Sequence, residues 1–264
     1  MPAPDAPTPI PDLFGVAGKV VVVTGGTRGI GRMIAGGFVA AGATVIVSSR
    51  KADACAETAE ALSAFGSCTA IPADLSSEAG AQALADQVGA AHDRLDVLVN
   101  NAGATWGAPL AEHDHESWRR VLDLNVEGVF HTTKLLLPLL QAAGTAEEPA
   151  RVINIGSIDG IHVPMLETYS YSSSKAAVHQ LTRHLARHLA PAITVNAIAP
   201  GPFESKMMAA TLDAFGDQIA ASAPLKRIGR PDDMAGTALF LASRAGSYLT
   251  GAIIPVDGGI ATVG

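Results

Sequence analysis

The amino-acid sequence predicts an α/β fold in which one doubly wound parallel sheet of about seven strands is covered by helices on both faces. Short apolar runs such as 19–23 and 95–99 show no polar alternation, which is typical of strands buried on both sides. Most of these runs alternate with longer segments whose apolar residues have helical spacing, and this alternation favours parallel pairing. No repeat, charge block or linker divides the chain. We therefore expect a single domain over residues 13–264, preceded by a loose tail at residues 1–12.

The expected elements can be placed along the chain from these patterns. Runs that suit strands lie at 19–23, 44–48, 68–71, 95–99, 151–155, 193–198 and 252–256. Segments with helical spacing lie at 30–41, 52–65, 76–91, 112–141, 169–189 and 231–244. Ser76 and Glu78 favour a helix start, and Pro231 favours another. Pro138, within the long segment 112–141, predicts a kink or a turn near its end.

Composition limits the classes of function. Of 264 residues, 48% are apolar and 16% are charged, which is enough for a large core. A net charge of -7 disfavours nucleic acid and anionic membranes as partners, because both require a basic face. No apolar run reaches the roughly 18 residues that a membrane span needs. The five prolines of residues 1–12 resemble neither a signal nor a transit peptide, and Cys55 and Cys68 have no metal or CxxC spacing. We expect a cytoplasmic protein that acts on a small molecule.

The turn after the first expected strand is rich in glycine. It reads Thr24-Gly25-Gly26-Thr27-Arg28-Gly29-Ile30-Gly31 and leads directly into a helix. Glycine clusters also serve packing, and the spacing here is G-x-x-x-G-x-G instead of G-x-G-x-x-G. The strand–turn–helix position nevertheless indicates a Rossmann-type dinucleotide site. The backbone expected around the pyrophosphate belongs to Gly25, Thr27, Arg28, Gly29, Ile30 and Gly31.

The end of the second expected strand favours NADP over NAD. An NAD site usually has an Asp or Glu there to hold the ribose 2′-hydroxyl, whereas this chain has Ser49-Arg50-Lys51. A guanidinium can bind a 2′-phosphate through two hydrogen bonds, and Arg28 offers a second cation. The alternative is that Arg50 and Lys51 are simply solvated at the end of a strand.

A Tyr–Lys pair opens the segment 169–189. Tyr171 and Lys175 stand at i and i+4, so a helix places them on the same face. A nearby ammonium favours the phenolate, which would bring the pKa of Tyr171 closer to working pH and suit it to acid–base catalysis. The same spacing occurs on many solvated helices. Tyr169 has Ser173 four residues later and therefore has no cation partner.

Taken together, the motifs resemble the short-chain dehydrogenase/reductase family over nearly the whole chain, from about Leu13 onward. They occur in the order typical of that family. They are Thr24-Gly25-x-x-x-Gly29-x-Gly31, Asp74-Leu75, Asn100-Asn101-Ala102-Gly103, Asn125, Ser157, Tyr171-x-x-x-Lys175, Asn196 and Pro200-Gly201.

The resemblance implies four catalytic residues. Tyr171 would exchange a proton with the substrate oxygen while a hydride passes between the nicotinamide and the substrate carbon. Lys175 would lower the pKa of the tyrosine and hold the nicotinamide ribose. Ser157 would polarise the carbonyl. Asn125, in mid-helix, would hold a water that connects Lys175 to solvent.

The resemblance also implies further cofactor contacts. Asp74 would contact the adenine, with Leu75 packed beside it. The turn at Asn101, Ala102 and Gly103 would line the cofactor groove, together with Tyr171 and Lys175. Pro200, Gly201 and Ser205 would lie against the nicotinamide and the phosphates, although the family often has Thr where Ser205 stands. The segment 202–223 would act as a lid.

The amino-acid sequence around Tyr171 is most similar to that of reductases of 3-oxoacyl thioesters. The expected activity is NADPH-dependent reduction of a 3-oxoacyl group or a similar apolar ketone. The alternatives are oxidation of a secondary alcohol, sugar or steroid, and a non-catalytic NADP-binding sensor or scaffold. Mostly apolar segments at 104–110, 158–168 and 202–223 would shape the substrate pocket, although such stripes often serve packing.

Two further expectations concern metals and assembly. His184 and His188 lie one helical turn apart, and His113 and His115 flank Asp114, but no third ligand stands at suitable spacing, so no metal is expected. The segments 112–141 and 169–189 have more apolar positions than one core-facing stripe requires. Because family members pair these helices, we expect a homo-oligomer, with a homotetramer preferred.

Overall fold

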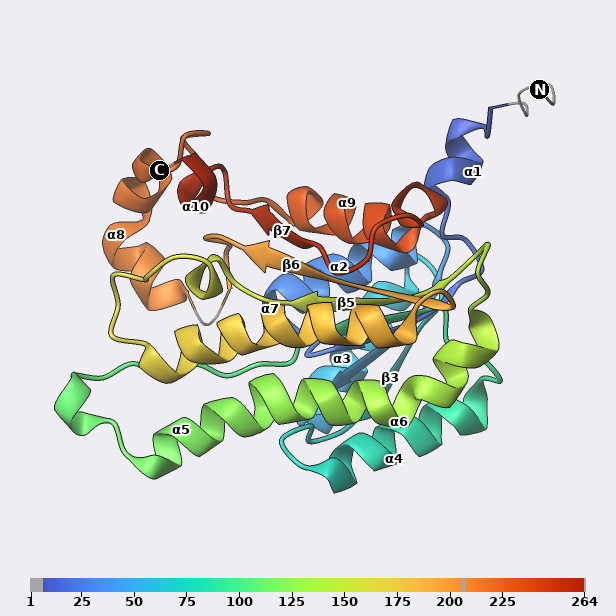
Figure 1. Cartoon of the computed structure of the whole chain (residues 1–264), viewed down its shortest axis with the longest axis horizontal. Coiled ribbons are helices and arrows are strands. Elements are labelled where there is room, and N and C mark those ends of the chain that lie inside the picture. Colours follow the sequence, from blue (N-terminus) through green and yellow to red (C-terminus); the bar gives the residue numbers. More distant parts are fainter. Residues whose placement is uncertain (1–6, 206–207, 264) are drawn as a thin grey trace.

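The computed structural model describes residues 7–205 and 208–263 and confirms the α/β class (Figure 1). Its seven parallel strands lie in the order β3-β2-β1-β4-β5-β6-β7. The strand bounds are β1 Val20–Thr24, β2 Thr44–Ser49, β3 Cys68–Pro72, β4 Val97–Asn100, β5 Ala150–Ile155, β6 Ile193–Pro200 and β7 Ile253–Val256. The expected strands differ from these by one or two residues at their ends.

Most helices alternate with the strands along the chain. Their bounds are α1 Ile10–Phe14, α2 Gly29–Ala40, α3 Ala52–Ser63, α4 Glu78–Ala91, α5 His115–Leu122, α6 Gly128–Ala143, α7 Tyr169–Leu189, α8 Ala209–Ser222, α9 Pro231–Ala242 and α10 Ile260–Val263. Among residues 7–205 and 208–263, no helix has both the length and the apolar character that a membrane-spanning helix needs.

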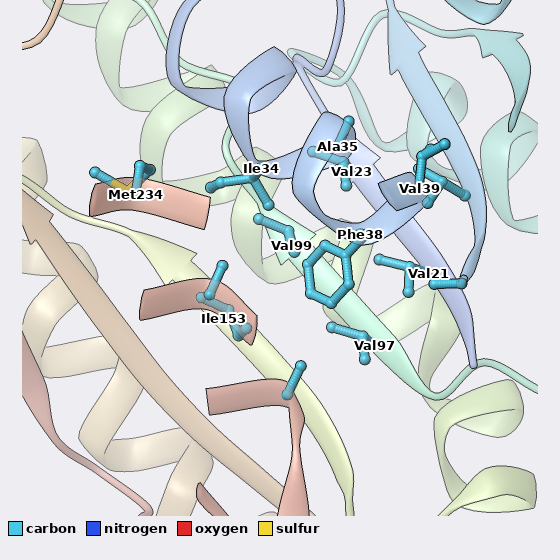
Figure 2. Packing of buried hydrophobic residues seen from close by; sticks show 14 of the residues in the cluster. Val21, Val23, Ile34, Ala35, Phe38, Val39, Val97, Val99, Ile153 and Met234 are labelled. Atoms are coloured by element: carbon cyan, nitrogen blue, oxygen red, sulfur yellow. The ribbon is translucent and has the colours of Figure 1, made fainter. Parts of the chain in front are cut away.

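Alternate residues of each central strand contribute to two separate cores. Val21 and Val23 point to one face of the sheet, where Phe38 of α2 packs against them (Figure 2). Val22 points to the other face, which α4, α6 and α7 cover. Because both faces are buried, these strands have no polar alternation. Full burial of a side chain such as Phe38 contributes about 1.5–3 kcal/mol to stability.

The expected helix 112–141 is interrupted. A short 3₁₀ turn, Leu110–Glu112, precedes α5, and a π-helical turn, Asp123–Glu127, separates α5 from α6. Asp114 caps α5 by accepting a hydrogen bond from Ser117 N at 2.8 Å, which explains why the helix begins after residue 112. Pro138 lies inside α6. The start of α4 also differs, because Ser77 and not Ser76 is its N-cap.

The apolar pattern did not predict the helices α1, α8 and α10. Residues 10–12, expected to belong to a loose tail, form part of α1, which begins next to the prolines at 9 and 11. The first six residues of that tail lie outside the described part of the chain. The expected lid segment, 202–223, contains α8, and its residues 206–207 also lie outside the described ranges.

A buried network of polar side chains joins two central strands to the helices α6 and α7. Asn100 Nδ2 donates to Asn154 Oδ1 at 2.9 Å and to Thr133 Oγ1 at 3.0 Å. Asn154 Nδ2 donates in turn to Thr182 Oγ1 at 2.9 Å. The network therefore joins β4 and β5 to α6 and α7 close to the sheet edge where the site lies. A network whose members are all paired favours one arrangement of these elements.

Candidate active site

The predicted site residues gather at the carboxyl edge of the sheet. Thr24 pairs with Ser48 in the register of β1 and β2, and Asn100 pairs with Asn154 in that of β4 and β5. The turns that follow these strands therefore meet at one edge. The sheet order reverses direction at β1, which has β2 on one side and β4 on the other. Such a switch point is the usual place for a ligand crevice in a doubly wound sheet.

The glycine turn is closely packed against the turn after β4. Gly25 and Gly29 have φ values of +62° and +51°, which favour glycine. A Cβ at Gly31 would lie 2.3 Å from Asn101 Nδ2, so this position has no room for a side chain. The backbone can consequently approach a ligand at the start of α2, where free N–H groups favour an anion. These residues fit a dinucleotide pyrophosphate.

Thr24 holds the two turns together, a role that the motif alone did not reveal. Its hydroxyl accepts hydrogen bonds from Asn101 N at 2.9 Å and Ala102 N at 3.0 Å, and donates to Val99 O at 3.2 Å. Asn101 Nδ2 donates to Thr24 O at 2.9 Å and to Gly25 O at 3.1 Å. The side chain of Asn101 therefore supports the glycine turn from behind. A threonine at the end of a buried strand was the available signal for this role.

The residues expected at the adenosine end lie beyond β2 and β3. Arg28, Arg50 and Lys51 are all exposed, and residues 48–51 include no carboxylate. Ser49 is half-buried, with Oγ 3.4 Å from Cys55 Sγ. Asp74 is exposed and accepts hydrogen bonds from Ser76 N and Ser76 Oγ, while the neighbouring Leu75 is buried. This end of the site offers cations and hydroxyls, and it fits a phosphate.

The segment after β6 returns to the glycine turn. Gly201 N donates to Val256 O at 2.9 Å, which fixes the turn after Pro200 against β7. Ser205 lies beside Gly29, since a Cβ on that glycine would be 3.1 Å from Ser205 Cβ. Ser205 is therefore adjacent to the predicted phosphate site. Met207, which was expected to face substrate, lies outside the described residues.

Ser157, Tyr171 and Lys175 lie together where β5 ends and α7 begins. Ser157 follows β5 and is 7% exposed, and its hydroxyl accepts a hydrogen bond from Asp159 N at 3.1 Å. A side-chain hydrogen bond links Ser157 to Tyr171. Lys175 Nζ lies 5.5 Å from the centroid of the Tyr171 ring and donates to Ile155 O at 2.8 Å. A phenol, a hydroxyl and an ammonium thus lie together, and a Cβ at Gly103 would lie 3.8 Å from the ammonium.

The pKa of Tyr171 is shifted in the direction opposite to the prediction. Burial of the phenol raises its pKa to about 12, although the hydrogen bond with Ser157 opposes this rise. Burial also lowers the pKa of Lys175 to about 8. The expectation that the Tyr–Lys pair brings the pKa of Tyr171 closer to working pH is therefore wrong for this structure, because desolvation of the phenol dominates.

Asp159 is a titratable group of the site that sequence reasoning missed. It stands two residues after Ser157, and burial raises the pKa of its carboxyl while His162 and Lys175 lower it. Its negative charge in turn raises the pKa of both Tyr171 and Lys175. Its position in the turn after the predicted catalytic serine was the only sequence signal.

Asn125 lies in the π-helical turn and not in the α-helix that was expected. Its Nδ2 donates to Ala104 O and to Ser174 Oγ, both at 2.9 Å, and its Oδ1 accepts from Ala104 N at 2.8 Å. Ser174 Oγ then donates to Tyr171 O at 2.7 Å. π-Helical turns often occur at functional sites. Here the turn places the Asn125 amide between the end of the β4 loop and α7.

Apolar side chains form an exposed rim near the site. Val163 is 89% exposed and Met165 is fully exposed. The rim is tied to the loop before α5 through His113 Nε2, which lies 3.0 Å from Ala108 O and 3.3 Å from Glu167 O. Tyr169 packs edge-on against His113 at 5.1 Å and donates to Glu167 at 2.9 Å. Tyr169 therefore belongs to this rim, whereas Tyr171 belongs to the site.

The two histidine pairs noted in the sequence do not belong to a cluster of metal ligands in the described residues. The rings of His184 and His188 lie 4.9 Å apart in a tilted arrangement on α7. Within residues 7–205 and 208–263, no three or more His, Cys, Asp or Glu side chains come together in a way that could hold a metal ion.

A doubly wound sheet with a glycine turn at its switch point, and with a Ser–Tyr–Lys group between the end of β5 and the start of α7, is the architecture of a dinucleotide-dependent oxidoreductase. Residues 25–261 match the family model described as "Enoyl-(Acyl carrier protein) reductase". The chain belongs to the short-chain dehydrogenase/reductase family.

Similar proteins come from this family. The chain is 52% identical over 252 residues to the rhamnolipids biosynthesis 3-oxoacyl-[acyl-carrier-protein] reductase of Pseudomonas aeruginosa, covering 93% of this chain and 97% of that protein. The solved Pseudomonas aeruginosa RhlG/NADP active-site complex matches with a TM-score of 0.92 and 51% identity, over 95% of this chain and 99% of that one. A cis-4-hydroxycyclohexanecarboxylate dehydrogenase of Sinomonas cyclohexanicum is 38% identical over 94% of this chain and 98% of its own length.

Proposed function

We propose that the protein uses NADPH to reduce the ketone of a 3-oxoacyl thioester, or of a similar apolar substrate, to a secondary alcohol. The observation that carries this proposal is that Ser157, Tyr171 and Lys175 lie together beside the turn at Gly103, where a Cβ would lie 3.8 Å from Lys175 Nζ. The 3-oxoacyl reductase that is 52% identical to this chain supports the substrate class.

NADPH would occupy the carboxyl edge of the sheet. Gly25, Gly29 and Gly31 would admit the pyrophosphate, and Arg50 with Ser49 would bind the 2′-phosphate. The remaining contacts would come from Thr27, Arg28, Ile30, Lys51, Asp74, Leu75, Asn101, Ala102, Gly103, Tyr171, Lys175, Pro200, Gly201 and Ser205. When bound, the cofactor supplies the hydride. The NADP complex of the solved relative supports this choice.

Each catalytic side chain would have a separate task. Ser157 would donate a hydrogen bond to the substrate carbonyl oxygen and polarise it. Tyr171 would then give that oxygen its proton, because a phenol whose pKa is raised to about 12 is protonated throughout the working range. Lys175 would stabilise the resulting phenolate as long as the Lys175 amine is protonated and carries a positive charge. Asn125 would keep the loop at Ala104 in place beside Lys175.

Oxidation of a secondary alcohol, sugar or steroid is the second candidate. The dehydrogenase relative at 38% identity favours it. The raised pKa of Tyr171 favours reduction, since oxidation requires the phenolate as a base. A purely cofactor-binding sensor or scaffold is disfavoured because all four catalytic side chains are present. Three of them, Ser157, Tyr171 and Lys175, lie close together.

Three features of organisation accompany this proposal. The segment 202–223 would close over the cofactor, and its beginning would be anchored by Phe203, which is buried and pairs with Gly229 in an isolated bridge. A homotetramer would cover apolar side chains on α6 such as Phe130, which is 43% exposed. The two buried free cysteines, Cys55 and Cys68, fit a reducing cytoplasm.

The test is turnover by the purified protein with NADPH and a substrate panel. Acetoacetyl and longer 3-oxoacyl thioesters, a 2-enoyl thioester, a ketosteroid and a sugar ketone would be compared, together with NADP⁺ and the matching alcohols. We expect the highest kcat/KM for the 3-oxoacyl thioesters. No turnover of any thioester would reject the substrate class, and turnover of the enoyl thioester alone would reject ketone reduction.

A further inference from the structure

His179 of α7 is buried next to the turn that carries Ser157. It stands one helical turn after Lys175, and only 4% of its surface is exposed. A Cβ at Gly156 would lie 2.2 Å from His179 Nε2 and 2.7 Å from His179 Cδ2. A Cβ at Gly160 would lie 2.9 Å from His179 Cε1. The imidazole therefore contacts the backbone at both ends of the five-residue turn 156–160, and Ser157 stands inside that turn.

Hydrogen bonds also hold the turn. Gly156 N donates to Ile198 O at 2.7 Å, and Gly160 N donates to Ser157 O at 3.1 Å. The first bond fixes the beginning of the turn to β6, and the second only closes the turn on itself. On the side that faces α7, Ser172 Oγ donates to Asp159 O at 2.8 Å, and the imidazole packs against two residues without a Cβ. The ring contacts the turn on both sides of Ser157, whereas the Ser172 bond holds only its later part.

We propose that His179 is a positioning residue for Ser157: its imidazole packs between Gly156 and Gly160 and keeps the serine hydroxyl in the place that ketone polarisation requires. This proposal rests on the proposed function, in which Ser157 polarises the substrate carbonyl. His179 touches neither substrate nor cofactor in this arrangement and acts through the turn.

The electrostatic setting suits a neutral ring in this role. Burial lowers the pKa of His179 to about 4, with Lys175 and Arg183 lowering it further and a hydrogen bond to the Gly160 backbone raising it. The imidazole is consequently uncharged at working pH and adds no cation beside Lys175. Its Nε2 has no hydrogen-bond partner within the described chain, as expected for a ring whose close fit to Gly156 leaves no space for one.

The far side of the ring offers space into which it can be displaced. A surface hollow of about 520 Å³ is lined by Gly160, Ile161, Ala176, His179, Gln180, Arg183, Ile253 and Pro255. A side chain added at Gly156 would therefore push the imidazole toward this hollow without disrupting the main cores. This space allows the proposal to be tested with folded variants.

The experiment is a double-mutant cycle on the full-length enzyme with acetoacetyl thioester and NADPH. We expect Gly156→Ala to lower kcat by about tenfold, because the new methyl group displaces the ring and the turn. His179→Ala should lower kcat by a similar factor. In the double variant the two losses should not multiply, since the methyl group then occupies space left by the ring. The Kd for NADPH should remain that of the wild type in all three.

Gly160→Ala is the matched control. Its Cβ would lie 2.7 Å from Ala176 N and 2.7 Å from Lys175 C, which are backbone atoms that the removal of a side chain does not relieve. Combined with His179→Ala, it should give losses in kcat that multiply. Should His179→Ala fail to fold, His179→Val fills part of the space without an atom at the Cδ2 or Nε2 positions.

The outcomes separate this proposal from the proposed function. If the wild-type enzyme is active but the kcat losses of Gly156→Ala and His179→Ala multiply in the double variant, the positioning role is overturned. The reductase activity itself then still stands. A change confined to Tm, with kcat and KM of the wild type, shows that His179 only stabilises the fold and also overturns it. An inactive wild-type protein rejects the proposed function before the cycle begins.

Discussion

The two sides of the site are built differently. On the cofactor side, glycine turns and hydrogen bonds such as that from Asn101 N to Thr24 Oγ1 fix the backbone around a narrow space. On the substrate side, the rim consists of exposed side chains such as Met165 and Val163. The first arrangement can accept only one shape of ligand, whereas the second can adapt to several. The contrast predicts that changes around the glycine turns alter cofactor binding, whereas changes on the rim alter substrate preference.

The largest expected effect comes from the residue where the two sides meet. Tyr171→Phe removes the proton donor and keeps the ring, so kcat should fall by about 10³-fold. NADPH affinity should be little changed, because Tyr171 supplies only one of many expected cofactor contacts and the substitution keeps its ring. Single-turnover kinetics and a fluorescence titration of NADPH would measure both. Tyr169→Phe, on the rim, is the matched control and should retain kcat; equal losses in the two variants would contradict the assignment of Tyr171.

Arg50→Ala tests the cofactor side alone. Loss of a charge-assisted hydrogen-bonded pair with the 2′-phosphate should weaken NADPH binding by about 10- to 100-fold. The affinity for NADH should not change, because NADH lacks that phosphate. Isothermal titration with both cofactors would measure the difference. Arg187, which is exposed on α7 far along the helix, is the control. Equal weakening of NADH would indicate a general defect in place of phosphate recognition.

The pH dependence of reduction should come from Lys175. Its pKa is lowered to about 8, so the ammonium is present below that pH and is lost above it. We therefore expect kcat for reduction to fall about tenfold per pH unit above about 8, while Tyr171 remains protonated. Stopped-flow rates measured across this pH range would record the fall in kcat.

Asp159→Asn sharpens the same prediction. The Asp159 charge raises the pKa of Lys175, so removal of this charge should move the falling limb of the pH–rate profile to lower pH. Asp232→Asn, on the surface of α9, should leave the limb where it is. A limb that stays in place in the Asp159 variant would show that another group controls the pH profile.

The cofactor side was also the part that the sequence predicted best. Buried strands, glycine turns and a Tyr–Lys pair are local patterns with a known spacing, and the strand and helix order followed from them. The hydrogen bonds of Thr24, the charge of Asp159 and the contact of His179 with Gly156 depend on residues that are far apart in the chain. Their signals were single residues of ordinary type. The rise in the pKa of Tyr171 could not be read from an i, i+4 pair either, because burial is a property of the folded chain.

The smallest expected effect belongs to the rim. Met165→Ser should raise KM for a long 3-oxoacyl thioester by about fivefold, since an apolar contact of one or two methylene groups is lost. The kcat for an acetoacetyl thioester should not change, because its chain is too short to reach beyond the catalytic group. Thermal unfolding should also be unchanged, since Met165 is fully exposed. Phe65→Ser, at an apolar residue after α3 that is 74% exposed, is the control. If the Met165 variant instead lowered kcat for both chain lengths alike, the rim would belong to the rigid part of the site, and the contrast between its two sides would fail.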